Sequence, residues 1–238
     1  MYFTGQHIIV TGASTGIGRA TALMLAAHGA RVSLIARSQA NLDSAVAEIS
    51  EAGGCAAAFV ADVADRSALA TAISAAIAAQ GVPDGLFANA GFGGEFAPFG
   101  DFSDANWDTL IATNQTSVFV SIRSVLATMI AHRRGSIVVT GSLASERGMP
   151  MNAGYVASKH AVLGLARAAA IEAAPHNVRV NCINPGFIAT PMLDTIPGGE
   201  AALPSLAVNV PQTRLGQPDE AAALVCFLLS DAASHITA

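Results

Sequence analysis

The sequence predicts an α/β fold: a single Rossmann-type, doubly wound parallel sheet with helices on both faces. Short apolar runs alternate along the chain with helical segments of ten or more residues, which is the order of right-handed β-α-β units. A cluster of glycines separates the first apolar run from the first helix, as in dinucleotide-binding folds. The chain has 238 residues, of which 52% are hydrophobic and 12% charged, enough for a substantial buried core.

Six strands and six helices are expected in alternation. Gly29 closes the first helix, and Gly53 and Gly54 follow the second. The expected strands span residues 7–10, 31–35, 57–61, 85–89, 136–140 and 178–183. The expected helices span residues 17–28, 41–51, 66–80, 106–132, 155–174 and 219–229, and the fourth has a break near Asn114.

The whole chain, residues 1–238, is interpreted as one dinucleotide-binding and catalytic domain. Its one irregular region, residues 186–217, is long for a connection and carries several prolines around Gly198 and Gly199. Connections of this kind are typical of lids and binding loops. We therefore predict a substrate lid over these residues.

Charge and cysteine content limit the kinds of partner and the cellular location to be expected. The net charge is −5 and the basic residues are scattered, so no basic field for nucleic acid is expected. Cys55, Cys182 and Cys226 are far apart and lack metal-ligand spacing, so neither a disulfide framework nor a metal site is indicated. With no signal peptide and no apolar run long enough for a membrane span, we expect a cytoplasmic protein.

The glycine cluster has the features of a phosphate-binding turn. Gly12 permits the turn, Gly16 lets a pyrophosphate approach the backbone, and Gly18 allows close packing. The helix start at Ile17, preceded by Ser14 and Thr15, would supply N–H groups. The same residues also match Gly-x-Ser-x-Gly, the nucleophile elbow of hydrolases. Only ten residues precede Thr11, whereas an elbow normally follows several strands, so the cofactor interpretation is favoured.

The ends of the second and third strands bear on the cofactor. An acidic residue after the second strand would accept from the ribose 2′-hydroxyl of NAD, whereas this chain has Arg37, a cation suited to a 2′-phosphate. NADP(H) is therefore favoured over NAD(H). Asp62 could accept from the adenine amino group or cap the next helix.

Tyr155 and Lys159 are four residues apart, so they lie one turn apart on one helix face. A neighbouring cation favours the phenolate and is expected to lower the pKa of Tyr155 toward the working range. Such a pair could transfer protons. The alternative is an ordinary surface pair on a helix.

Taken in order, these motifs resemble the short-chain dehydrogenase/reductase family over about residues 5–236. The matching residues are Thr11 to Gly18, Asp62 with Val63, Asn89-Ala90-Gly91, Asn114, Ser142, Tyr155 with Lys159, and Pro185-Gly186 followed by Thr190.

The resemblance implies a catalytic tetrad of Asn114, Ser142, Tyr155 and Lys159. Hydride transfer to a ketone builds negative charge on its oxygen, so a proton donor and a hydrogen bond are needed at that atom. In the resemblance, Tyr155 donates the proton, Ser142 orients the carbonyl, Lys159 holds the phenolate and the nicotinamide ribose, and Asn114 fixes a water.

The resemblance also implies the cofactor contacts. The implied cofactor-binding residues are Gly12, Ser14, Thr15, Gly16, Ile17, Gly18, Arg37, Asp62, Val63, Asn89, Ala90, Gly91, Tyr155, Lys159, Pro185, Gly186, Ile188 and Thr190.

The activity expected is an NADP(H)-dependent carbonyl reductase or alcohol dehydrogenase acting on an apolar or aromatic small molecule. The substrate class comes from apolar residues in the segments expected to flank the pocket, namely Phe92, Phe96, Met149, Met151, Phe187, Met192 and Leu193. The alternatives are a 3-oxoacyl thioester reductase and a sensor that binds NADP(H) without turnover.

A homo-dimer or homo-tetramer is expected. Members of the family usually continue into a seventh strand that takes part in subunit contacts, and this sequence stops at Ala238 before that strand. The sequence therefore leaves the choice of oligomer open.

Overall fold

The computed structural model describes residues 3–238 and contains a six-stranded sheet whose paired strands all run parallel. The strand order is β3-β2-β1-β4-β5-β6, so the order reverses between β1 and β4, where a doubly wound sheet opens a crevice for ligands. This confirms the predicted fold class. The strands are β1 (His7–Thr11), β2 (Arg31–Ala36), β3 (Cys55–Val60), β4 (Gly85–Ala88), β5 (Gly135–Thr140) and β6 (Val178–Ile183).

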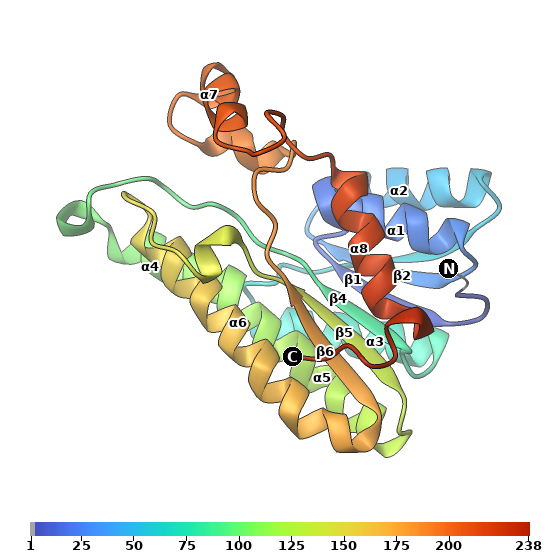
Figure 1. The fold of residues 1–238 in the computed structure, drawn as a ribbon. Helices are drawn as coiled ribbons and strands as arrows, with labels where there is room; N and C mark the ends of the chain where they lie inside the picture. Colours follow the sequence, from blue (N-terminus) through green and yellow to red (C-terminus); the bar gives the residue numbers. More distant parts are fainter. Residues whose placement is uncertain (1–2) are drawn as a thin grey trace.

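Helices cover both faces of the sheet (Figure 1). On one face lie α1, α2 and α8, and on the other α3, α5 and α6, with α4 preceding α5. The α-helices are α1 (Gly16–Ala27), α2 (Gln39–Glu51), α3 (Arg66–Gln80), α4 (Asp104–Leu110), α5 (Ser117–Ala131), α6 (Ala153–Ala173), α7 (Leu203–Val208) and α8 (Pro218–Leu229).

The alternating side chains of the strands build two apolar cores, one on each face. On β1, Ile9 belongs to the core beneath α3, α5 and α6, whereas Ile8 and Val10 belong to the core beneath α1 and α8. All three side chains are fully buried, as expected for a central parallel strand. These cores fix the carboxyl ends of β1, β4 and β5 side by side, which places the site.

The expected break near Asn114 is a π-helical segment, Ile111–Thr116, between α4 and α5. A π-helical turn inserts an extra residue into the helix and is common at functional sites. Here it turns Asn114 inward, and the residue is fully buried.

The C-terminal residues lie at the edge of β6. The Ala238 amide donates to the Val180 carbonyl at 3.0 Å, and the Thr237 hydroxyl accepts from the Val180 amide at 3.1 Å. Within residues 3–238 these contacts do not extend into a seventh strand.

The irregular segment after β6 carries α7 and stands away from the sheet (Figure 1). Two backbone hydrogen bonds close its base: the Ala189 amide donates to the Gly216 carbonyl at 2.8 Å, and the Gly216 amide to the Phe187 carbonyl at 2.9 Å. Its 3₁₀ turns are Pro191–Thr195 and Gly199–Ala202. Among the described residues, no helix combines the length and apolarity that a membrane span needs.

Candidate active site

The glycine turn after β1 has no room for larger side chains. A Cβ on Gly12 would lie 2.8 Å from the Ala90 Cα, and one on Gly18 would lie 2.2 Å from the Gly12 carbonyl oxygen. Gly12 and Gly16 also have φ values of +66° and +53°, which other residues rarely adopt. The chain therefore keeps a bare backbone where α1 meets β1.

The start of α1 is open to an anion. Thr15 is the N-cap residue, but its side chain makes no capping hydrogen bond, and the first turn of α1 carries no acidic residue. Uncapped N–H groups at a helix N-terminus attract phosphate. The bare glycines and the uncapped helix together fit the pyrophosphate of a dinucleotide.

Asn89 ties three strand ends together. Its Nδ2 donates to the Thr11 and Gly12 carbonyls at 3.3 and 3.4 Å, and its Oδ1 accepts from the Thr140 hydroxyl at 3.1 Å. The Thr11 hydroxyl in turn accepts from the Asn89 and Ala90 amides at 3.0 and 3.2 Å. The turn at residues 89–91 is thus held beside the glycine turn.

Arg37 follows β2, and its side chain is 77% exposed. Its guanidinium lies 4.0 Å from the Asp62 carboxylate, and this loose, exposed pair leaves the cation available to a ligand. Asp62 accepts from the Ala64 amide at 3.0 Å. The N-cap of α3 is Asp65, so the capping alternative for Asp62 is wrong.

Lys159 is buried beside the end of β5. Only 3% of the residue is exposed, and its Nζ donates to the Thr140 carbonyl at 2.7 Å. An ammonium carries three donors, so two remain for other acceptors. Burial lowers the pKa of Lys159 from 10.5 to about 8.

Tyr155 lies one turn before Lys159, and the Lys159 Nζ is 5.7 Å from the centre of its ring. Burial raises the pKa of Tyr155 above its usual value of 10, and the nearby Ser142 hydroxyl opposes that rise. The pKa of Tyr155 thus shifts opposite to the sequence-based expectation, because burial dominates. The phenol therefore keeps its proton at neutral pH.

Asn114 and Ser142 complete the cluster from other elements. The Asn114 amide holds the loop after β4: its Oδ1 accepts from the Phe92 amide and its Nδ2 donates to the Phe92 carbonyl, both at 3.0 Å. Its Nδ2 also lies 3.2 Å from the Ser158 hydroxyl on α6. The Ser142 hydroxyl accepts from the Ala144 amide at 3.1 Å.

The structure also brings the start of the irregular segment to the glycine turn. A Cβ on Gly16 would lie 3.0 Å from the Thr190 Cγ2. The Leu143 amide donates to the Pro185 carbonyl at 3.0 Å, while Gly186 borders open space and Ile188 bridges to Gly216. Val63, in contrast, is buried in the core, so its side chain faces away from ligands.

The structure places the residues expected to flank the pocket in different parts of the molecule. Met192 lies over Gly93, since a Cβ added to Gly93 would be 3.8 Å from the Met192 Cγ. Leu193 is buried. Met149 and Met151 line a mainly apolar cavity of about 470 Å³ together with Val156, Ala157 and His160. Asn152, the N-cap residue of α6, also lines this cavity, whereas the four residues of the predicted tetrad do not.

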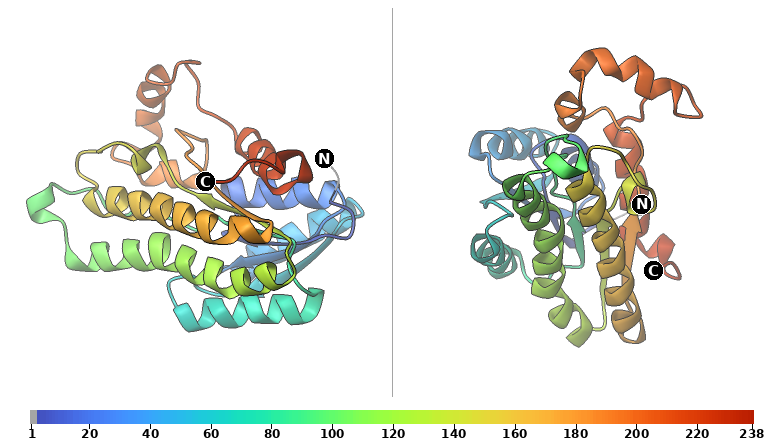
Figure 2. Two further views of the ribbon diagram at one scale, coloured as in Figure 1. Left: turned by 60° about the horizontal axis from the view of Figure 1, so that its bottom comes forward. Right: turned by 90° about the vertical axis from the view of Figure 1, so that its left-hand side faces the viewer.

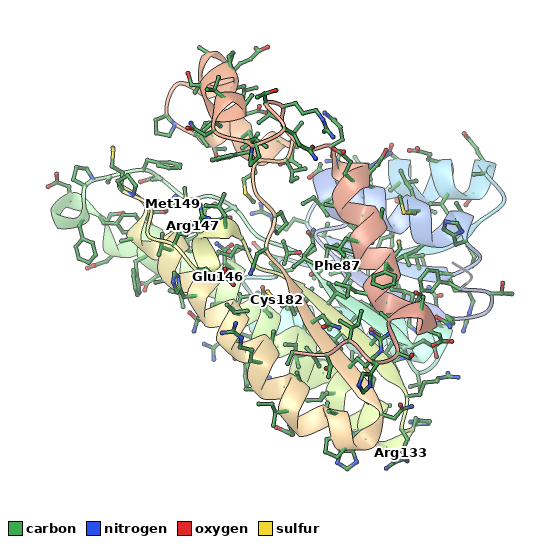
Figure 3. All side chains as sticks on the ribbon, viewed as in Figure 1. Phe87, Arg133, Glu146, Arg147, Met149 and Cys182 are labelled. Atoms are coloured by element: carbon green, nitrogen blue, oxygen red, sulfur yellow. The ribbon has the colours of Figure 1, made fainter. Side chains whose placement is uncertain are left out.

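Figure 3 labels Glu146, Arg147 and Met149 on the loop after β5, at the opposite end of the sheet from Arg133. The Glu146 carboxylate accepts from the Asn184 side chain at 3.5 Å, at the outer limit of a hydrogen bond.

Sequence reasoning did not assign roles to Thr140, Ser158 and Asn152. Thr140 anchors both Lys159 and Asn89, and Ser158 connects Asn114 to the Tyr155 carbonyl, to which its hydroxyl donates at 2.8 Å. Ser158 adjoins Lys159 in the sequence, but its hydrogen bond to Asn114 cannot be predicted without the folded sheet. The same holds for the hydrogen bonds of Thr140 to Lys159 and Asn89.

The comparisons agree with this geometry. The family model described as enoyl-(acyl carrier protein) reductase matches residues 12–238. The levodione reductase of Leifsonia aquatica is 38% identical over 99% of this chain and 91% of its own length. A crystal structure of levodione reductase superimposes with a TM-score of 0.94 at 36% identity, covering 99% of this chain and 94% of that one.

Two further relatives carry other names. The cyclohexanol dehydrogenase of Acinetobacter sp. (strain SE19) is 39% identical over 99% of this chain and 92% of its own length. The 3-oxoacyl-[acyl-carrier-protein] reductase of Thermotoga maritima is 36% identical over 100% of this chain and 95% of its own length. The chain belongs to the short-chain dehydrogenase/reductase family and is an oxidoreductase of carbonyl and alcohol substrates.

Proposed function

We propose that the protein is an NADP(H)-dependent reductase of ring ketones, working in reverse as a secondary-alcohol dehydrogenase. The observation that carries the proposal is the buried Lys159, which lies beside Tyr155 at the same end of the sheet as the glycine turn. That turn and the uncapped N-terminus of α1 fit the phosphates of the cofactor. The nicotinamide supplies the hydride when bound.

In the proposed mechanism, Tyr155 donates its phenolic proton to the oxygen that gains charge as the carbonyl is reduced. Ser142 hydrogen-bonds the same oxygen and orients the carbonyl. Lys159 uses its two remaining donors on the ribose hydroxyls, and its charge stabilises the phenolate left after proton transfer.

Asn114 has a positioning role in this proposal. It fixes the backbone of Phe92 and contacts Ser158, which hydrogen-bonds the Tyr155 carbonyl. The Asn114 Oδ1 and the Lys159 Nζ lie on the same side of Gly91: a Cβ added to Gly91 would be 3.2 Å from the first atom and 3.6 Å from the second. This proximity supports a water between the two groups that relays a proton.

The pKa of Lys159 predicts the pH dependence. Because burial lowers that pKa to about 8, the ammonium is present below pH 8 and is lost as the pH rises through this value. We expect kcat/KM for ketone reduction to be flat between about pH 6 and 7 and to fall about tenfold per pH unit well above pH 8. Initial rates across this range, with circular dichroism as the control for folding, test this expectation. A profile that stays flat to about pH 10 would contradict it.

Arg37 is proposed to select the phosphorylated cofactor. A charge-assisted contact to the 2′-phosphate is worth about 1.5–3 kcal/mol, so kcat/KM with NADPH should exceed that with NADH by about ten- to a hundredfold. Arg37→Ala should remove most of this ratio while leaving the NADH value within about twofold. Arg66→Ala, at the start of α3, serves as the matched control. Equal efficiencies with the two cofactors in the unmodified enzyme would exclude this role.

We propose that residues 186–217 act as the substrate lid. The base of this segment is pinned between Phe187 and Gly216, and Thr190 and Met192 reach the glycine turn and Gly93. The part around α7 stands away from the sheet in Figure 1, as a lid does before it closes over a ligand.

A six-membered-ring ketone is the proposed substrate, because the relatives include a cyclohexanol dehydrogenase. Met192, in the proposed lid, adds an apolar side chain over Gly93. A panel of cyclic, aromatic and linear ketones incubated with NADPH tests the proposal by loss of absorbance at the nicotinamide band. Turnover of ring ketones is expected. Tight NADPH binding with no oxidation by any ketone would favour the sensor alternative.

A 3-oxoacyl thioester reductase is the second candidate, because a relative of 36% identity carries that name. The same four residues support that reaction. An acidic carrier protein needs a basic docking surface, and the net charge of −5 disfavours this candidate.

We further propose that the chain forms a homo-oligomer through the outer faces of α5 and α6. The views in Figure 2 show these two helices side by side. Phe119 on α5 and Ile171 on α6 are exposed large apolar side chains, of the kind that marks an interaction surface.

A further inference from the structure

Three buried asparagines hold the loop that follows β4. Asn114 makes hydrogen bonds to both the amide and the carbonyl of Phe92, and Asn106 does the same for Glu95, both at 3.1 Å. Asn152 donates its Nδ2 to the Gly93 carbonyl at 2.9 Å. Its Oδ1 is buried and has no hydrogen-bond partner within the described chain, unlike the Oδ1 atoms of the other two.

The unpaired oxygen is not explained by helix capping. Asn152 is the N-cap residue of α6, yet its side chain makes no capping hydrogen bond. The preceding residue, Met151, has a φ of +62°, and its carbonyl accepts from the Ala97 amide at 2.8 Å. An unpaired buried acceptor next to a strained residue is costly, and such features concentrate where a ligand is bound.

Asn152 lies on the reactive side of α6. It precedes Tyr155 by three residues and Lys159 by seven, so the three side chains follow one face of the helix. Its partner Gly93 lies beneath the proposed lid, since a Cβ there would be 3.4 Å from the Thr195 Oγ1. The carboxamide therefore lies beneath the proposed lid, three residues, or about 4.5 Å of helix rise, before Tyr155.

We infer that the Asn152 Oδ1 accepts a hydrogen bond from a hydroxyl on the substrate, across the ring from the reacting carbonyl. The inference rests on the proposed reduction of ring ketones and deepens it. The substrate class is then a 4-hydroxycyclohexanone, or a cyclohexane-1,4-diol in the oxidative direction. Met192, a flexible thioether side chain over Gly93, shifts to let the hydroxyl reach the oxygen before the lid closes.

The test compares kcat/KM for 4-hydroxycyclohexanone and for cyclohexanone, which lacks the hydroxyl. The unmodified enzyme is expected to favour the hydroxylated ketone about tenfold, the worth of one hydrogen bond to a buried acceptor. Asn152→Ala should bring this ratio close to one by raising KM for the hydroxylated ketone. Asn106→Ala removes a buried amide on α4 that holds the same loop, so it should change both efficiencies in parallel and leave the ratio intact.

A ratio that Asn152→Ala leaves unchanged would overturn the inference while the proposed function stands. If the enzyme reduces neither ketone, the proposed function fails. Binding to the enzyme loaded with NADP⁺ then judges the inference separately, without any variant. Cyclohexane-1,4-diol should bind about tenfold more tightly than cyclohexanol, and equal affinities would contradict the role of Asn152.

Discussion

Replacing Tyr155 with Phe is expected to lower kcat for ketone reduction about a thousandfold, the usual contribution of a positioned general acid. The substitution removes the phenolic oxygen and leaves the half-buried ring in place. Burial raises the pKa of this phenol, so the native side chain is protonated and ready to donate at neutral pH. The variant has no proton to give to the oxygen that gains charge.

NADPH affinity provides the control for this variant. The glycine turn, the start of α1 and the Lys159–Thr140 hydrogen bond do not involve the phenolic oxygen, so the dissociation constant should change by less than about threefold. Fluorescence titration with NADPH measures that constant, and steady-state rates measure kcat. A variant with the unmodified rate would show that Tyr155 is not the acid.

Gly18→Ala is expected to have the second large effect. The new Cβ would lie 2.2 Å from the Gly12 carbonyl oxygen and 2.6 Å from the Asn89 Nδ2, and neither backbone nor the clamping amide can move freely. Overpacking of this kind costs about 3 kcal/mol, which lowers Tm by roughly 6–10 °C in a chain of this size. The displaced turn should also weaken NADPH binding by at least about tenfold, because its backbone approaches the phosphates.

Gly100→Ala is the matched control. Gly100 is exposed in the 3₁₀ turn Phe99–Asp101, and a Cβ there would meet nothing within 4 Å. Its Tm and NADPH affinity should equal those of the unmodified protein. Scanning calorimetry and the same NADPH titration compare the two variants. Equal Tm values for both would contradict the close packing between α1 and the glycine turn.

Local patterns predicted the frame of the fold well. Each strand is a short apolar run between turn residues, so the six strands and their order along the chain could be predicted, and α3 begins and ends at the predicted residues. The break at Asn114 was also predicted, but not its π-helical form. In that form Asn114 hydrogen-bonds to Phe92, a residue that only the folded sheet brings within reach.

The electrostatics of the site could not be predicted from spacing. A four-residue interval places Lys159 near Tyr155, but it does not reveal that Lys159 is buried and donates to the Thr140 carbonyl, or that desolvation raises the pKa of Tyr155. Met149 and Met151 show the same limit. They belong to the expected loop, yet that loop directs them into a cavity on another face of α6.

Deuterium transfer tests the central claim most directly. NADPH that carries deuterium at the transferring position of its nicotinamide is incubated with the enzyme and cyclohexanone, and the alcohol is analysed by mass spectrometry and NMR. Hydride transfer predicts one deuterium on the carbinol carbon of every product molecule and none on the hydroxyl, whose proton comes from Tyr155 and then from water. An alcohol without deuterium on that carbon, or NADPH that remains unoxidised, would contradict the account.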